Sequence, residues 1–292
     1  SSQQLFAFQN ALLIGCILEE HNLLDLKKFF YMIKQVLSIR KELLKGGNFK
    51  QYIRTVKPLA CMILIIDHYA MFREKTGDIF ESDILELLRV GENCGIYLMV
   101  SAGGFGGSEL PNRLAENFRT GISLGMSDKY QYASILRVNR VTLCPKNGIA
   151  GRGLVMINDQ PLEFQTALLF CETDDYTRTE KIKEACRKRN EELKTCKAAK
   201  RLPVFSEEMT YQAFFKSEEI VSSMINKMEL PFGYFVETGA PASIKFKENY
   251  CYLVLGRAGS GKSNFIKLII TAAMKQRMQV TLIDEEKKEL EQ

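Results

Sequence analysis

Apolar residues along this chain occur in two patterns, short continuous runs and longer stretches with helical spacing. The continuous runs lie at residues 12–18, 61–66, 96–101 and 250–255. Runs of this length that are bounded by loop residues are typical of strands buried on both faces of a parallel sheet. Between Leu26 and Leu44 apolar residues recur at helical spacing, and Gly46 and Gly47 follow, which predicts a helix that ends at the glycines.

The same two patterns continue to residue 172. Further helices are predicted at 79–89, 110–117 and 129–136, and further strands at 121–126 and within 153–169, where two strands are joined at Asn158–Pro161. Strands and helices alternate, so residues 1–172 are expected to form an α/β domain with a mainly parallel sheet flanked by helices. The strands at 61–66 and 96–100 are expected to be adjacent at its centre.

The pattern of apolar and charged residues changes twice after residue 172. Residues 173–230 read as a charged linker, with a solvated helix or linker at 176–200 and one amphipathic helix at 217–228. Residues 231–292 return to alternation, with predicted strands at 244–246, 250–255 and 279–283 and a helix at 262–276. We therefore predict that 231–292 is the opening of a second α/β domain, and that this domain is incomplete.

Composition indicates a soluble chain of reduced cysteines. No apolar run approaches the ~18–20 residues that a membrane span needs, and the first residues lack the features of a signal peptide. A membrane anchor is therefore expected to lie outside this chain. The eight cysteines form no CxxC pair, which favours buried thiols over disulfides or zinc.

The charge is concentrated in one segment. The net charge of the chain is +5, and residues 178–201 hold ten Lys or Arg against four Glu, a local excess of six. The remainder is close to neutral, so a basic surface that spans the whole chain and binds nucleic acid is not indicated. A solvated helix between domains is the favoured interpretation of this segment, and a lipid- or nucleic-acid-binding surface is the alternative.

One motif carries a specific chemistry. The sequence GRAGSGKS fits the pattern G-x-x-x-x-G-K-[ST] of a phosphate-binding loop, between a predicted strand and a predicted helix. Its residues are Gly256, Arg257, Ala258, Gly259, Ser260, Gly261, Lys262 and Ser263. The glycines allow backbone N–H groups to surround an anion, Lys262 supplies a charge for the β- and γ-phosphates, and the Ser263 hydroxyl is a ligand for Mg²⁺. ATP and Mg²⁺ are therefore the predicted ligands.

Hydrolysis needs an acid at the end of a neighbouring strand as well. Asp284 ends the first predicted strand after the motif, whereas the Mg²⁺-holding acid of this class comes much later. Asp67 ends the run MILIID and resembles such an acid, but His68 follows it where a catalytic Glu is expected. Two alternatives stay open: Asp67 is a helix-capping residue, or Asp67 serves Lys262 in one permuted domain.

The motifs together resemble the FtsK/SpoIIIE-like ATPases, and specifically the multi-domain ATPase of type VII secretion systems (the EssC/EccC type). The matching stretches are LLRVGENCGIYLMVSAG, NRLAENFRTGISLGMSDKYQYASIL, GRGLVMINDQPLEFQTALLF, ELPFGYFVETGAPASIKF and YCYLVLGRAGSGKS. The resemblance implies RecA-like P-loop NTPase domains in tandem. On this reading, 1–172 is the C-terminal part of a degenerate ATPase domain and 231–292 opens the next one.

Three departures from the family pattern suggest that the first domain is catalytically degenerate. His68 stands where a Glu is expected, Glu92 replaces the second Arg of the family's "ARxGR" segment, and the loop Gly103–Gly107 lacks the "TQ" that follows this strand in DNA translocases. The family's ring arrangement implies that an arginine approaches a neighbour's nucleotide. Arg89 and Arg119 are the matching candidates.

The resemblance implies an ATP-binding module of a secretion ATPase at the cytoplasmic face of the cell membrane. Its implied partners are small helical secreted proteins and other subunits of the machine, with a homo-oligomer in the full-length form and no specific nucleic acid. The alternatives are a DNA translocase of the same superfamily and a nucleotide-binding scaffold without turnover. ATP hydrolysis is expected of the full-length protein and not of this chain alone.

Overall fold

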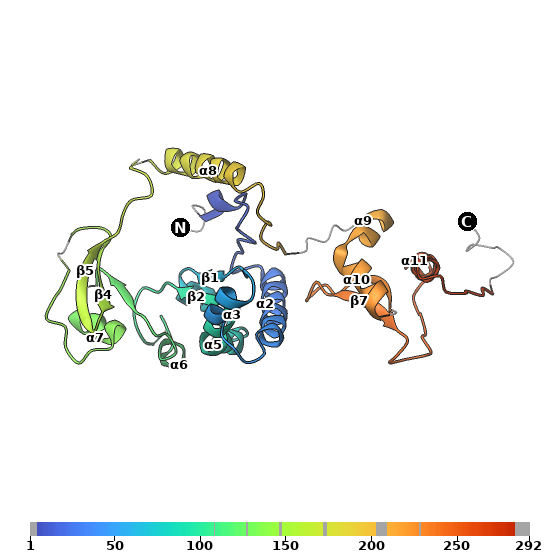
Figure 1. Cartoon of the computed structure of the whole chain (residues 1–292), viewed down its shortest axis with the longest axis horizontal. Helices are drawn as coiled ribbons and strands as arrows, with labels where there is room; N and C mark the ends of the chain where they lie inside the picture. Colours follow the sequence, from blue (N-terminus) through green and yellow to red (C-terminus); the bar gives the residue numbers. More distant parts are fainter. Residues whose placement is uncertain are drawn as a thin grey trace. The chain divides into compact units, whose positions relative to one another are not determined.

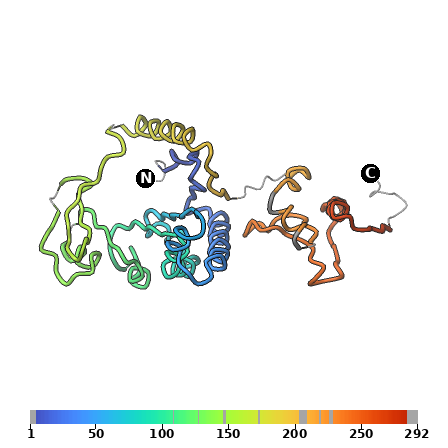
Figure 2. The backbone as a smooth tube through the Cα atoms, in the orientation of Figure 1, coloured from blue at the N-terminus to red at the C-terminus, as the bar shows by residue number. Residues whose placement is uncertain are grey.

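The computed structural model describes residues 5–107, 109–126, 128–145, 148–171, 174–202, 209–227 and 229–283. The chain divides into two compact units, Ser1–Arg201 and Leu202–Gln292, which can be followed by colour along the chain in Figure 1 and as a backbone trace in Figure 2. Each unit has a hydrophobic core of its own.

A parallel pair of strands lies at the centre of the first unit. Strand β1 (Met62–Ile66) pairs with β2 (Ile96–Val100), and the register aligns Met62 with Ile96 and Ile66 with Val100. The prediction that these two apolar runs are adjacent strands is confirmed. The expectation of a mainly parallel sheet is wrong for the described residues, because this pair is their only parallel pairing and the other strand pairs are antiparallel.

Helices cover one face of the β1–β2 pair. Helix α2 (Leu23–Leu44) begins at Asn22, whose side chain accepts a hydrogen bond from the Asp25 amide, and ends at Lys45 in the left-handed region. Its apolar face packs with that of α5 (Glu81–Val90), and the Phe30 and Phe80 rings stack with centroids 4.5 Å apart. Ile33, Ile84 and Ile96 are almost fully buried there.

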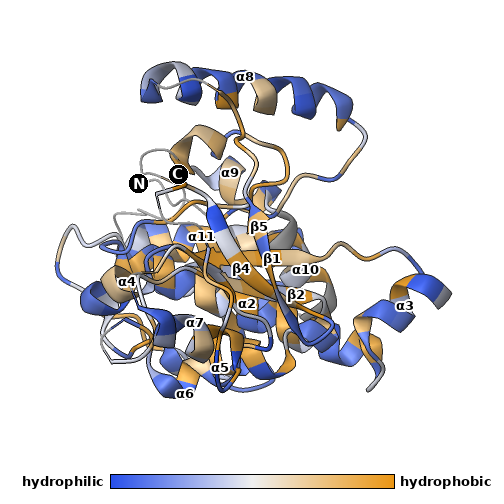
Figure 3. Ribbon diagram, turned by 90° about the vertical axis from the view of Figure 1, so that its left-hand side faces the viewer, coloured by the Kyte–Doolittle hydropathy of each residue, from blue (hydrophilic) through white to orange (hydrophobic). Residues whose placement is uncertain are grey.

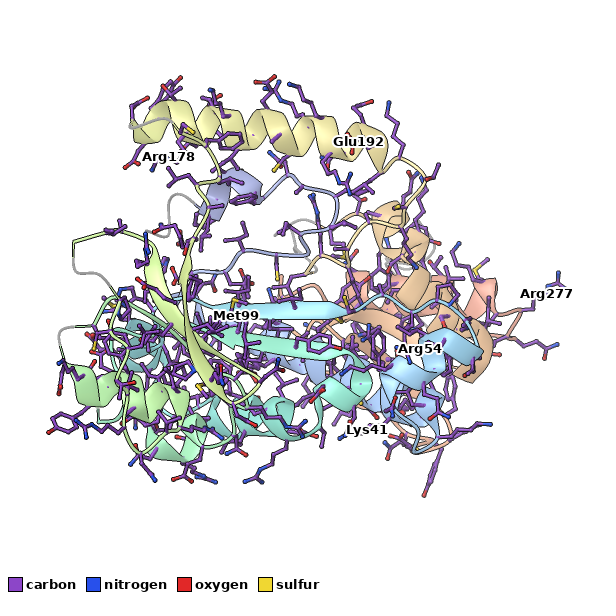
Figure 4. All side chains as sticks on the ribbon, turned by 60° about the vertical axis from the view of Figure 1, so that its left-hand side comes forward. Lys41, Arg54, Met99, Arg178, Glu192 and Arg277 are labelled. Atoms are coloured by element: carbon purple, nitrogen blue, oxygen red, sulfur yellow. The ribbon has the colours of Figure 1, made fainter. Side chains whose placement is uncertain are left out.

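The other face of the pair is uncovered. Ile63, Ile65 and Met99 are 63%, 64% and 57% exposed, and Figure 4 marks Met99 on this side. The prediction that both strands are buried on both faces is therefore wrong. A continuous apolar run does not show which face finds a partner, and the helices that pack on β1 and β2 within the described residues lie on the Leu64 face.

A buried arginine fastens α2 to the beginning of both strands. Arg40 is 7% exposed, and its guanidinium donates to the carbonyl oxygens of Cys94, Gly95 and Ala60 at 2.8, 3.1 and 2.7 Å. The first two carbonyls directly precede β2, and the third lies two residues before β1. Arg40 therefore sets where the two strands enter the sheet.

Short helices connect these parts of the first unit. They are α3 (Phe49–Thr55), α4 (Tyr69–Thr76), α6 (Asn112–Ala115) and the 3₁₀ turn η2 (Glu92–Cys94). The predicted helix at 110–117 is thus a single turn in the structure, and the helix predicted at 79–89 is confirmed as α5.

A three-stranded antiparallel sheet forms a second sheet of the first unit, separate from the β1–β2 pair. Strand β4 (Arg152–Ile157) lies between β3 (Ile122–Leu124) and β5 (Gln160–Gln165), and α7 (Lys129–Leu136) packs beside it. The predicted hairpin within 153–169 is confirmed. Its two-residue turn, Asn158 and Asp159, has both φ angles positive at 50° and 60°, the backbone that suits a tight antiparallel hairpin.

The beginning of the chain packs against and hydrogen-bonds to the charged helix α8 (Asp175–Glu192). Ala7, in the 3₁₀ turn η1 (Phe6–Phe8), packs with Ile182 and Cys186 of α8. The Asn190 side chain accepts from the Leu12 amide at 2.7 Å and donates to the Asn10 carbonyl at 2.8 Å. Helix α8 is confirmed as a largely polar helix, as its blue colour in Figure 3 shows.

These contacts between the beginning of the chain and the segment at and after α8 explain why residues 12–18 do not form the predicted strand. The Leu12 backbone bonds to Asn190 and to the Ala199 amide, and Gly15 approaches the Lys200 carbonyl so closely that a Cβ would lie 2.7 Å from it. The segment runs beside the chain after α8, and no strand pairs with it in the described residues.

The second unit packs helices against a hairpin. Strands β6 (Glu229–Tyr234) and β7 (Pro241–Lys245) are antiparallel, and α9 (Tyr211–Lys216), α10 (Glu218–Lys227) and α11 (Lys262–Lys275) contribute to one core. The helix predicted at 217–228 is confirmed as α10, and β7 overlaps the strand predicted at 244–246.

Two strands predicted in the second unit are absent from the described residues. Residues 250–255 and 279–283 have no strand assignment, and Tyr250, Leu253 and Leu255 are 94%, 82% and 82% exposed. An extended segment becomes a buried strand only when a neighbouring strand pairs with it, and none does here. Asp284 lies outside the described residues.

Candidate functional site

The GRAGSGKS segment forms an exposed turn that leads into α11. Gly259 and Gly261 have φ angles of 76° and 88°. Gly261 is the N-cap residue of α11, and it provides no side-chain hydrogen bond to the helix. These backbone angles favour glycine. A Cβ on Gly256 would lie 2.3 Å from the Ser260 hydroxyl oxygen, so the loop requires Ser260 to move if any larger residue replaces that glycine.

Lys262 closes the loop on itself. Its ammonium donates to the carbonyl oxygens of Gly256 and Arg257, both at 2.8 Å, and the Ser260 amide also donates to the Arg257 carbonyl at 3.2 Å. The lysine charge is therefore held at the mouth of the loop, six residues along the chain from its first glycine. Ala258 and Ser263 are exposed on the same turn.

The arrangement fits the phosphates of a nucleotide. The first amides of an α-helix have no acceptor within the helix and carry the positive end of its dipole, so Lys262 and Ser263 present N–H groups at the loop. The Ser263 hydroxyl is a hard oxygen ligand of the kind that Mg²⁺ prefers. When bound, ATP–Mg²⁺ would supply the phosphoryl group, and these residues would orient its phosphates.

Asp67 and His68 lie in the first unit, directly after β1. The Asp67 carboxylate accepts a hydrogen bond from the Ser101 hydroxyl at 2.5 Å. His68 has a φ angle of 60° and precedes α4, which has no side-chain cap. Asp67 is therefore bonded to the end of β2, and the alternative that it caps the following helix is not borne out. Sequence analysis missed Ser101, because a lone serine after an apolar run carries no local signal.

The loop after β2 is held by a carboxylate that the sequence did not single out. The Gly103 amide donates to Glu109 Oε2 at 3.1 Å. Within the residues that the structure describes, no group of three or more His, Cys, Asp or Glu side chains is placed to hold a metal ion. The eight cysteines are free, and burial raises the pKa of Cys94.

The two candidate arginines are exposed, and one is paired. Arg119 Nη1 lies 2.7 Å from Glu92 Oε2, and Lys50 Nζ lies 3.3 Å from Glu92 Oε1. Glu92 precedes β2 whereas Asp67 follows β1, so the pair lies at the opposite end of these parallel strands from Asp67. Arg89 is in the last turn of α5. The structure brings neither arginine to Asp67.

No protein-family model matches the chain, but curated relatives do. It is 24% identical over 253 residues to the ESX secretion system protein YukB of Bacillus subtilis (strain 168), which covers 84% of this chain and 16% of YukB. It is 22% identical over 261 residues to the ESX secretion system protein EccC of Geobacillus thermodenitrificans (strain NG80-2), with 86% and 17% covered. The chain thus spans about a sixth of the length of these relatives.

Solved structures share the fold. EssC (ATPases 2 and 3) from Geobacillus thermodenitrificans superposes with a TM-score of 0.69 at 21% identity, covering 93% of this chain and 51% of that one. Thermomonospora curvata EccC (ATPases 2 and 3) in complex with a signal sequence peptide gives a TM-score of 0.62 at 19% identity, covering 93% and 48%. The homologues of this chain are therefore type VII secretion ATPases of the EssC, EccC and YukB type, and it shares with them the α/β fold of P-loop ATPase domains.

Proposed function

We propose that this chain is an ATP-binding module of a membrane-coupled type VII secretion ATPase that drives the export of small helical proteins. The observation that carries the proposal is the loop Gly256–Ser263, whose two left-handed glycines, helix N-terminus and inward-turned Lys262 together suit the phosphates of ATP. The secretion part of the proposal is supported by the relatives, which are secretion system proteins.

The proposed organisation is two ATPase domains in tandem. Residues 1–172 are the C-terminal part of a degenerate FtsK-like domain, 173–230 are the linker, and 231–292 open the following domain. Asp67 and Lys262 then belong to different domains. His68 in place of a carboxylate supports the degeneracy of the first domain, because a histidine is a poor substitute beside Mg²⁺.

The proposed partners are small helical secreted proteins, other subunits of the machine, and further copies of the full-length protein at the cytoplasmic face of the membrane. A signal sequence peptide is bound in the Thermomonospora curvata neighbour, which supports a peptide partner. Within the described residues, none of the helices has the length and apolar content that crossing a membrane requires.

Specific nucleic-acid binding is not proposed, and the pairing of charges on α8 supports this. At least five of the ten basic residues at 178–201 form ion pairs within the helix or just beyond it. Counterion release from DNA needs unpaired cations arranged along its backbone. We therefore expect no tight duplex binding at physiological salt, and submicromolar affinity in an anisotropy titration would favour a DNA translocase instead.

Calorimetric titration with ATP–Mg²⁺ and a phosphate-release assay test the nucleotide site. Lys262→Ala is expected to weaken ATP binding, because it removes the charge nearest the phosphates, whereas Asp67→Ala is expected to leave binding unchanged. The chain alone is expected to hydrolyse no ATP above background, since loss of the water-positioning group and neighbouring arginine costs several orders of magnitude in rate.

Two outcomes of these experiments would contradict the proposal. Equal ATP affinity in the native chain and in Lys262→Ala would refute nucleotide binding at this loop. Robust turnover that Asp67→Ala abolishes would show that Asp67 and Lys262 serve one permuted active site, and the two-domain organisation would then be wrong.

A further inference from the structure

Ser101 makes an unusual set of hydrogen bonds at the end of β2. Its amide donates to the Ile66 carbonyl at 3.0 Å, its hydroxyl donates to Asp67 Oδ1 at 2.5 Å and accepts from the His68 amide at 2.8 Å, and its carbonyl accepts from the Tyr69 amide at 2.8 Å. One residue thus contacts four consecutive residues, from the last residue of β1 to the first residue of α4.

These bonds fix a turn that the backbone would not adopt without support. His68 has φ 60° and ψ 61°, a left-handed conformation that costs a non-glycine residue free energy and persists where surrounding contacts enforce it. The two bonds to the amides of His68 and Tyr69 provide that enforcement. The bond to Asp67 does something further, because it commits one carboxylate oxygen and so sets the rotation of the side chain.

We propose that Ser101 is a positioning residue for Asp67. In a P-loop ATPase domain the acid at this strand end holds Mg²⁺ through water, and its geometry depends on the direction of the carboxylate. With Oδ1 bonded to Ser101, the rotation of the carboxylate is set, and Oδ2 would be the oxygen that faces the water shell of a bound Mg²⁺. The proposal rests on the proposed function for the meaning of Asp67, but the coupling of Ser101 to Asp67 can be measured without nucleotide.

Nuclear magnetic resonance of the intact chain provides the test. The carboxyl carbon resonance of Asp67 is expected to shift in Ser101→Ala and to return in Ser101→Thr, which restores a hydroxyl. Amide hydrogen exchange at His68 is expected to be about tenfold faster in Ser101→Ala, because its amide loses the hydroxyl that accepts its hydrogen bond, and a loss of ~1.4 kcal/mol in protection is tenfold in rate. The Tyr69 amide keeps its bond to the backbone carbonyl of residue 101, so its exchange should change less. The threonine variant should exchange at the native rate.

Two further variants separate positioning from a general structural role. Asp67→Asn keeps an acceptor oxygen, so we expect native exchange at His68. In Asp67→Ala the Ser101 hydroxyl still accepts from the His68 amide, so exchange there should be slower than in Ser101→Ala, and the double variant should match Ser101→Ala. Ser82→Ala is the matched control, because Ser82 is another exposed serine with its hydroxyl beside a carboxylate, that of Asp83. It should leave the Asp67 resonance unmoved.

The proposal is overturned if the Asp67 resonance and the His68 exchange rate are unchanged in Ser101→Ala, or if the threonine variant fails to restore them. If Ser101→Ala unfolds the first unit, the threonine and Asp67→Asn variants decide alone, and a non-native rate in both overturns the proposal. ATP affinity at Gly256–Ser263 should not change in any of these variants, so a failure of the nucleotide proposal is read separately.

Discussion

Replacing Arg40 with Met is expected to loosen the β1–β2 pair from its beginning. Methionine fills much of the same volume but donates no hydrogen bond, so the carbonyls of Cys94 and Ala60 lose the guanidinium that satisfies them. The Gly95 carbonyl keeps a partner, because it also accepts from the Met62 amide at 2.9 Å. The change therefore leaves two carbonyls without their donor.

The magnitude follows mainly from the Cys94 carbonyl. An unsatisfied buried polar group costs about 1–3 kcal/mol, whereas Ala60 is exposed and its carbonyl can accept from water instead. The expected loss is therefore about 1–3 kcal/mol for opening of the pair. Burial lowers the pKa of Arg40, but an arginine side chain stays charged at neutral pH. Arg40→Lys keeps the charge and loses the fork of donors, so its loss should lie between that of Arg40→Met and zero.

Native-state hydrogen exchange with mass spectrometry is the suitable assay, because it reports each segment separately. Peptides that contain β1 and β2 should exchange faster in Arg40→Met, while peptides from β6 and β7 in the second unit should not change. Arg54→Met is the control, since Arg54 is exposed on α3. If Arg40→Met changed the opening free energy of β1 and β2 by no more than Arg54→Met does, the role assigned to Arg40 would be wrong.

Three further outcomes are expected. Gly261→Ala places a side chain at φ 88°, where strain is roughly 1–2 kcal/mol, and calorimetry should show weaker ATP binding. Burial raises the pKa of Cys16 to about 11, so at about pH 8 on the order of one thousandth of it is thiolate, and mass spectrometry should find iodoacetamide on exposed Cys61 long before Cys16. Hydrogen bonds from Thr177 hold the pKa of Asp174 below its ordinary value of 3.8. The Asp174 carboxylate therefore caps α8 fully above pH 3.8, and this stabilisation is lost as the pH falls through the lower pKa of the folded chain. Below that pH, circular dichroism should show the same helix content in the native chain and in Asp174→Ala.

Local signals explain what the sequence could predict. The glycine loop was predictable because its pattern of glycines, lysine and serine specifies a backbone within eight residues. The hairpin of β4 and β5 was predictable for the same reason, since Asn158 and Asp159 suit its turn. The adjacency of β1 and β2 was predictable because two continuous apolar runs in one α/β pattern have few other places to go.

Non-local pairing explains what the sequence could not predict. The runs at 12–18 and 250–255 are as apolar as β1, yet whether such a run becomes a strand depends on a partner elsewhere in the chain. Asn190 holds the first run away from any sheet, and no composition rule points from an asparagine in a charged helix to a backbone about 180 residues earlier. The contacts of Ser101 are of the same kind.

The exposed side chains of Ile63, Ile65 and Met99 are also expected to affect how the first unit behaves in concentrated solution. Large apolar side chains beside strand edges attract a second such surface. Near room temperature this attraction is driven by the release of water, so it weakens on cooling and strengthens in sulfate or phosphate. Concentrated solutions of the chain should therefore turn cloudy on warming and clear again in the cold.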